Sequence, residues 1–259
     1  MSAVETATIN ELIIEYHRLT RQILCIYQDD AMGCYDRIIR GHATLSSTKF
    51  MIPDNICKVH SIAHNKMKFK TQINNKISSV EFTNTKEMPK HGIGQGAGNG
   101  GTKWNFISVP MMKIVEEEAP GCSLRLPKGD KEWKKHIVGF VDDKRHYVNS
   151  PKSQICKRVI KGMEQSVLYW YELLNFSGGE LELDKCAWYI INWEFKKDKP
   201  QIKCLNKDLY IKSPNGKKIK SKQLQKNILT TYLGVTSQVN GEQSAQTKQP
   251  WQKGQTNKS

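Results

Sequence analysis

Residues 137–148 read Ile-Val-Gly-Phe-Val-Asp-Asp-Lys-Arg-His-Tyr-Val, and they are the most informative segment about the fold. The apolar run 137–141 is short enough for one buried strand, and residues 146–148 suit a second strand. The residues between them begin with Asp142 and Asp143. The stretch therefore predicts a β-hairpin that carries two adjacent acidic residues at its tip.

A second acidic pair follows another apolar run. Residues 23–27 fit a buried strand that ends at Asp29 and Asp30. If the two strands lie side by side, their carboxylates meet at one edge of a sheet, where mutual repulsion is costly unless cations neutralise it. Two divalent cations about 3.5 to 4 Å apart can stabilise the attacking and leaving oxygens of phosphoryl transfer. The two pairs together favour nucleotidyl transfer, although either pair alone is typical of a solvated turn.

The charge of the chain favours a polyanionic partner. The 259 residues include 40 Lys and Arg against 25 Asp and Glu, which gives a net charge of +15. Residues 195–259 hold 14 lysines and 3 acidic residues, so 11 of these positive charges lie in the last quarter. Such an excess attracts nucleic acid through counterion release, although many basic proteins bind none.

Cysteine spacing and hydropathy exclude other classes of protein. The seven cysteines form no C-x-x-C pair and lie near no His-x3-5-His pair, so we expect reduced thiols and no zinc site. No run of about 18 apolar residues occurs, and Glu5 and Glu11 interrupt any signal peptide. We expect an intracellular protein, in the nucleus or cytoplasm, with no membrane partner; the oligomeric state stays open.

Helical periodicity is clearest after the hairpin. Apolar residues recur every four positions from Ile155 to Val167, with Ser150 as the expected N-cap and Gly178 as the stop. Strand-like alternation resumes over 187–195. Shorter helices are expected after an Asn10 cap, from near Cys34, from Pro53 to about Lys68, and over 104–115 despite Pro110.

Two short motifs occupy the first half of the chain. Asp30 has an aromatic residue, Tyr35, five positions later, and an acidic residue follows it. A glycine-containing approach leads to Gln95 and Gly96, with Asn105 ten positions past the glutamine.

Three further motifs follow in the second half. An aromatic residue, any residue and two aspartates occupy positions 140–143. A glycine-rich turn over 178–184 leads to Lys185, and a Leu-Gly pair occupies 233–234. In this order the five motifs resemble those of reverse transcriptases, particularly the reverse transcriptases of retrotransposons.

The resemblance implies an RNA-directed DNA polymerase. Its expected fold is α+β, the palm of a right-hand polymerase, with an antiparallel sheet and helices packed on one face. It implies two Mg²⁺ ions, or Mn²⁺, held by Asp30, Asp142 and Asp143. The expected partners are a template-primer of RNA or DNA and deoxynucleoside triphosphates. The motif spacing assigns the first metal ligand to Asp30 and not to Asp29.

The resemblance also implies roles for residues beside the metals. The carbonyl of Ala31 would add a ligand, and Tyr35 would lie beneath the incoming sugar, where its ring excludes a 2′-hydroxyl. Packing in a core is the alternative for Tyr35. Lys185 would donate a proton or positive charge to the departing pyrophosphate, or it is only a surface lysine.

The glycine-rich loop has two interpretations. In the reverse-transcriptase interpretation, Gln95, Gly96 and Asn105 bind the template and the nucleotide, because glycine permits close approach of the backbone. Residues 96–103 also resemble a P-loop, but with Thr102 and Lys103 in exchanged order and with no strand immediately before. The exchange argues against an NTPase.

Two departures from the family pattern shape the expected domains. Glycines and Lys103 follow Gly96, where the family has small residues and a proline. Only 29 residues precede Asp30, too few for the fingers that grip a triphosphate. We expect a palm over 1–195 with the fingers largely missing, a Lys-rich segment near the palm and thumb over 196–239, and a disordered tail over 240–259.

These features leave three hypotheses open. The first is a polymerase palm, in a truncated copy or in a piece of a longer polyprotein. The second is a catalytically inactive remnant that binds nucleic acid through its Lys-rich end. The third is an unrelated basic domain whose acidic pairs lie at turns.

Overall fold

The computed structural model describes residues 2–85, 91–93, 100–125, 131–150, 156–197, 199–203, 205–224, 229–232 and 235–238. These residues divide into two compact units. The first unit takes in the described residues of Met1–Met32, Met111–Asn175 and Leu181–Ser259, and the second takes in those of Gly33–Pro110 and Phe176–Glu180. The predicted tail over 240–259 lies outside the described residues, and the boundaries predicted at 195 and 239 stay predictions.

The first unit is built around a mainly antiparallel sheet. Its elements are α1 (Ala3–Thr20), β1 (Ile23–Asp29), β4 (Cys122–Arg125), β5 (Glu132–Lys135), β6 (Ile137–Phe140), β7 (Asp143–Ser150), α6 (Cys156–Phe176, whose last residue belongs to the second unit), β8 (Ala187–Ile191), β9 (Trp193–Lys196), β10 (Lys199–Ile202), β11 (Tyr210–Lys212), β12 (Lys218–Lys220), β13 (Lys222–Gln223), β14 (Leu229–Tyr232) and β15 (Val235–Gln238). Two-stranded hairpins form from β4–β5, β9–β10, β11–β12 and β14–β15.

Strand β1 lies at the centre of the five-stranded sheet, whose order is β13-β8-β1-β7-β6. It pairs antiparallel with β7, from Ile23 opposite Ser150 to Asp29 opposite Lys144, and antiparallel with β8 on its other side. Only the short β13 joins in parallel. All residues of β1 except Gln28 are buried, so the expected apolar strand is confirmed and extends to Asp29.

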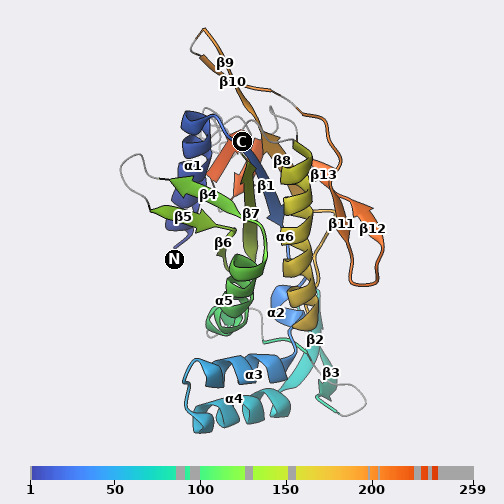
Figure 1. Ribbon diagram of the computed structural model, residues 1–259. Coiled ribbons are helices and arrows are strands. Elements are labelled where there is room, and N and C mark those ends of the chain that lie inside the picture. Colours follow the sequence, from blue (N-terminus) through green and yellow to red (C-terminus); the bar gives the residue numbers. More distant parts are fainter. Residues whose placement is uncertain are drawn as a thin grey trace, which may run out of the picture. The chain divides into compact units, whose positions relative to one another are not determined.

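Helices cover both faces of this sheet, because alternate residues of β7 contact different helices (Figure 1). Arg145 and Tyr147 donate hydrogen bonds to Asn10 on α1, at 2.9 and 3.0 Å. His146 lies on the other face, against Ser166 of α6. The expectation of helices on one face is therefore wrong. The continuous apolar run of β1 already indicated burial on both faces of the sheet. A strand with one solvent-exposed face would instead alternate apolar and polar residues.

Aliphatic and aromatic side chains from α1, the sheet and the β4–β5 hairpin form the main core of the first unit. The cluster consists of Ile13, Ile14, Leu24, Ile26, Cys122, Leu124, Val138, Tyr147, Tyr189, Ile191 and Trp193. Leu24 and Ile26 of β1 and Tyr147 of β7 belong to this cluster, so the strand pair that ends at the acidic residues is anchored in the core.

One predicted helix cap is wrong. Helix α1 begins at Ala3, because Ser2 and Glu5 form a reciprocal capping box. Asn10 is instead a buried acceptor within that helix. Ser150 is the last residue of β7, where its backbone pairs with Ile23. Residues 151–155, which precede the described start of α6 at Cys156, lie outside the described residues, so the predicted Ser150 cap stays a prediction. The predicted end of α6 before Gly178 is confirmed.

The second unit is mainly helical. Its elements are α2 (Cys34–Arg37), α3 (Arg40–Lys49), α4 (Asp54–Lys66), β2 (Lys68–Ile73), β3 (Lys76–Thr83) and the first part of α5 (Gly100–Glu118), which continues into the first unit past Pro110. Trp104 and Ile38 are fully buried in this unit. Arg40 donates to the carbonyls of Gly92 and His64, at 2.8 and 3.0 Å, and so ties α3 to two other segments. Among the described helices of both units, none is long and apolar enough to cross a membrane.

Candidate active site

The hairpin predicted from residues 137–148 is present and is tighter than expected. Phe140 pairs with Asp143, so only Val141 and Asp142 form the turn. Val141 has a φ of 55°, a left-handed conformation that costs a β-branched residue about 1–3 kcal/mol. The sequence suggested a longer turn because Lys144 and Arg145 are charged. Both side chains are nevertheless buried, and both residues belong to strand β7.

The β1–β7 pairing brings the two acidic pairs to one end of the sheet. Asp29 lies opposite Lys144, so Asp30 follows at the end where Asp143 begins its strand. Burial is the largest cause that raises the pKa of Asp143, and the charges of Asp142 and Asp30 raise this pKa further. These carboxylates therefore lie within electrostatic reach of one another, although more than a hundred residues separate them along the chain.

Asp30 lies at the centre of this cluster. Burial raises its pKa most, the Lys185 ammonium lowers the pKa, and the charges of Glu182 and Asp142 raise it again. A divalent cation relieves such repulsion, so the donor set fits Mg²⁺ or Mn²⁺ chemically. Among the described residues, no three His, Cys, Asp or Glu side chains are spaced to hold a metal ion as they stand.

Glu182 is the residue of this site that the sequence analysis did not single out. Its backbone N–H donates to the Asp30 carbonyl at 2.8 Å, and Ala31 forms an isolated bridge with Leu181. The glycine-rich turn that precedes Lys185 therefore lies beside Asp30. Lys185 itself is exposed and donates to Glu182 at 2.9 Å; this hydrogen bond and the charge of Asp30 raise its pKa. The sequence offered one indication of this role, because Glu182 is an acidic residue within the glycine-rich turn that leads to Lys185.

Asp29 points into the core instead. Its Oδ2 lies 3.1 Å from Nε2 of His146, whose Nδ1 lies 3.0 Å from the hydroxyl of Ser166. The order of groups matches a serine-hydrolase triad. All three side chains are buried, however, so no substrate reaches the hydroxyl. The chain of contacts acts as an internal brace between β1, β7 and α6.

The remaining predicted site residues lie in the second unit or outside the described residues. Tyr35 is half-buried in α2, and its ring lies 6.3 Å from that of Trp104. Asn105 is exposed on α5. Gln95 and Gly96 lie outside the described residues, as does the Leu-Gly pair at 233–234.

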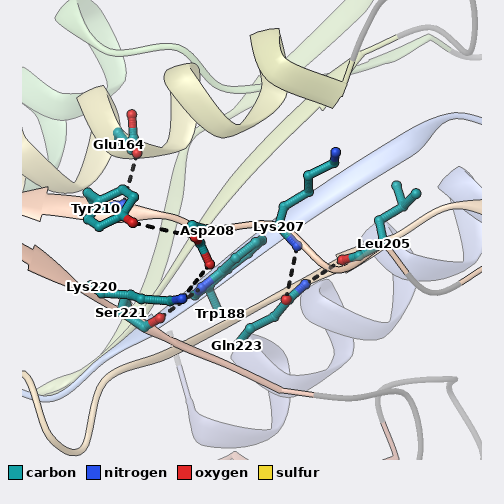
Figure 2. A network of polar contacts seen from close by, with 9 residues as sticks. All are labelled: Glu164, Trp188, Leu205, Lys207, Asp208, Tyr210, Lys220, Ser221 and Gln223. Carbon is teal, nitrogen blue, oxygen red and sulfur yellow. Dashed lines mark hydrogen bonds and ion pairs between the residues drawn. The ribbon is translucent and has the colours of Figure 1, made fainter.

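The β11–β12 hairpin presents a basic face. Lys212 lies opposite Lys218, and Tyr210 lies opposite Lys220, with all four side chains exposed. Figure 2 shows how this hairpin is anchored: the Tyr210 N–H donates to Glu164 of α6 at 2.9 Å, and Lys220 pairs with Asp208. The lysines are thus displayed from a fixed backbone.

Comparison with known proteins gave matches among solved structures only. No family model matches the chain, and no curated protein matches it. A telomerase from Candida tropicalis, without ligand and truncated from its C-terminal domain, matches with a TM-score of 0.39 and 13% identity over 92% of this chain and 38% of that chain. The same organism's telomerase with a fragment of telomeric RNA gives 0.37 and 14% over 71% and 29%, and the Candida albicans complex gives 0.39 and 13% over 93% and 34%. The chain thus spans about a third of the length of the telomerases it matches.

Proposed function

We propose that this chain is the palm region of a reverse transcriptase of the retrotransposon type, which copies a nucleic-acid template into DNA. The proposal is supported by the β1–β7 register, which brings Asp30, Asp142 and Asp143 to one end of the central strand pair, within electrostatic reach of one another. The order of the motifs, from Asp30 to the Leu-Gly pair at 233–234, supports the same assignment.

The proposed reaction is nucleotidyl transfer from a deoxynucleoside triphosphate to a primer end. Asp30, Asp142 and Asp143 would hold two Mg²⁺ ions, with the carbonyl of Ala31 as a further ligand. When bound, the ions supply charge stabilisation to the attacking and leaving oxygens. Lys185 would donate a proton or positive charge to the departing pyrophosphate. Its raised pKa keeps the ammonium charged, which favours the second of these roles.

Primer extension tests the proposal. The complete chain, with a primed RNA or DNA template and Mg²⁺ or Mn²⁺, is expected to add deoxynucleotides, and Asp142→Asn is expected to abolish the addition. Asp54→Asn is the matched control, because Asp54 is an exposed aspartate on α4 and should leave incorporation unchanged. Incorporation that survives in Asp142→Asn would rule out the assigned carboxylates.

The second candidate is a remnant that binds nucleic acid without catalysis, and the exposed lysines of the β11–β12 hairpin favour it. Calorimetric titration with Mg²⁺ or Mn²⁺ separates the two candidates. A palm binds the ions, and Asp30→Ala with Asp142→Ala abolishes this binding. Salt-dependent nucleic-acid binding without incorporation would identify the remnant.

A further inference from the structure

The second unit has a cavity of about 240 Å³, partly open to solvent, between α3, α4 and the start of α5. This volume is many times the ~10–15 Å³ that one water requires, so the cavity has room for an organic molecule. Apolar side chains form much of its wall: Ala43, Ile52, Ile56, Cys57, Ile93 and Phe106. All the lining residues belong to this unit, so the cavity does not depend on the carboxylate site.

One part of the wall is cationic. Lys103 is only 9% exposed, and its Nζ donates to Nε2 of His64 at 2.9 Å. Burial lowers the pKa of His64 to about 4, and the charges of Lys103 and Arg40 lower it too, so the imidazole is a neutral acceptor at pH 7. Burial also lowers the pKa of Lys103, and the charge of Arg40 adds to this effect.

These cations lack an acidic counterpart within the described part of the chain. Neither Lys103 nor Arg40 forms an ion pair there, and no described lining residue is acidic. A buried ammonium without a carboxylate is costly. Arg40 already gives three N–H groups to backbone carbonyls, which leaves few donors for an anion. One carboxylate matches this supply better than a phosphate, which carries more charge and three strong acceptor oxygens.

We propose that this cavity binds a small carboxylate with an aliphatic body, its anionic group against Lys103 and Arg40 and its chain against Ile56 and Phe106. The ligand is a monoanion because the cationic donors are confined to one part of an otherwise mainly apolar wall. The inference is independent of the polymerase proposal, since a chain inactive in primer extension would still possess this site.

Calorimetric titration of the complete chain with hexanoate, octanoate and decanoate, and with the alcohols of equal length, tests the site. Each added methylene is expected to tighten binding about fourfold until the cavity is filled. The carboxylate is expected to bind about tenfold or more tighter than its alcohol, because it accepts charge-assisted hydrogen bonds. Equal affinity for the alcohol, or no saturable binding of the acids, would overturn the proposal.

Lys103→Met identifies the cation responsible, because it keeps the apolar stem and removes the charge. The variant is expected to lose the preference for carboxylate over alcohol and to keep its affinity for the alcohol. Lys58→Met is the matched control: Lys58 is exposed on α4, outside the cavity wall, and should keep the preference.

Nuclear magnetic resonance of the wild-type chain covers the case in which Lys103→Met does not fold. Saturation with octanoate is expected to raise the pKa of Lys103, because a carboxylate beside an ammonium favours its charged form. An unchanged Lys103 titration at saturation would contradict the proposal. Displacement of octanoate by a short oligonucleotide would also contradict the proposal, because such displacement would identify the cavity as a phosphate-binding site.

Discussion

His17 sets a pH dependence for the stability of the first unit. Its ring is buried in α1, its Nδ1 lies 2.6 Å from the Ile13 carbonyl, and burial lowers its pKa from 6.5 to about 4. As the pH falls below 6.5, the unfolded chain therefore takes up a proton that the folded chain resists. The free energy of unfolding should rise between pH 4 and 6.5, with a slope of at most about 1.4 kcal/mol per pH unit from this group.

Urea denaturation of the wild type and of His17→Gln across pH 4.5 to 7.5 measures this contribution. Glutamine keeps a polar group near the Ile13 carbonyl and does not titrate. The difference between the two stabilities should grow in favour of the wild type as the pH rises to 6.5, and then level off. Parallel curves would show that the folded chain binds the His17 proton normally.

The buried brace of Asp29 and His146 predicts unequal effects for its members. His146→Leu leaves the Asp29 carboxylate buried without its imidazole partner, which should cost about 3–5 kcal/mol of unfolding free energy. Ser166→Ala removes only a neutral hydroxyl from the far side of the imidazole and should cost about 1 kcal/mol. Denaturant unfolding at pH 7 compares them, and equal losses would mean that the Asp29–His146 contact contributes nothing special.

At the scale of elements, the tip of the β6–β7 hairpin depends on a glycine. Gly139 lies opposite Lys144, and a Cβ added at Gly139 would fall 2.2 Å from the Lys144 Cδ. Lys144 is 1% exposed and its Nζ lies 5.7 Å from the Trp170 ring, so it has little room to withdraw. Gly139→Ala should therefore destabilise the fold by about 1–3 kcal/mol.

Thermal or denaturant unfolding checks the effect against Gly41→Ala. Gly41 lies in α3 and nothing stands within 4 Å of the position of its Cβ, so alanine should stabilise the chain there by about 0.5–1 kcal/mol. Opposite signs for the two substitutions are expected. A neutral Gly139→Ala would show that Lys144 moves without cost.

Helices and strands could be predicted from the sequence where the apolar repeat was long or where an apolar run was continuous. The four-residue repeat predicted α6, and the apolar run before Asp29 predicted β1. The hairpin turn was predicted over Asp142 to Arg145 but consists of Val141 and Asp142, because the charged Lys144 and Arg145 are typical of a loop. Their charged ends lie in the core through contacts from distant segments, and a local pattern contains no information on those contacts.

At the scale of the whole molecule, the candidate site required knowledge of strand pairing. Periodicity predicted a strand ending near Asp30 and another near Asp142, but either could have paired elsewhere in the sheet. The resemblance in motif order supplied the neighbour relation that the β1–β7 register then displayed. The sequence drew attention to Lys103 in the rival P-loop pattern and as a departure from the family pattern, but not as part of a cavity. Three helices form the cavity beside it, and no sequence motif describes such a site.

The charge distribution of the whole chain leads to the last prediction, which concerns nucleic-acid binding. Lys212 and Lys218 face each other across the exposed side of the β11–β12 hairpin, where like charges are mutually destabilising unless an anion lies between them. Lys212→Gln with Lys218→Gln should lower the salt slope for single-stranded nucleic acid by about 1.4, two phosphate contacts in all. The measurement is the dissociation constant, by fluorescence anisotropy, between low and moderate salt.

Lys220→Gln is the control from the same face. Because Asp208 already pairs with Lys220, removal of the Lys220 charge should change the slope less. An unchanged slope in the double variant would place the phosphate contacts on another surface, since counterion release depends only on the cations that actually meet the polymer.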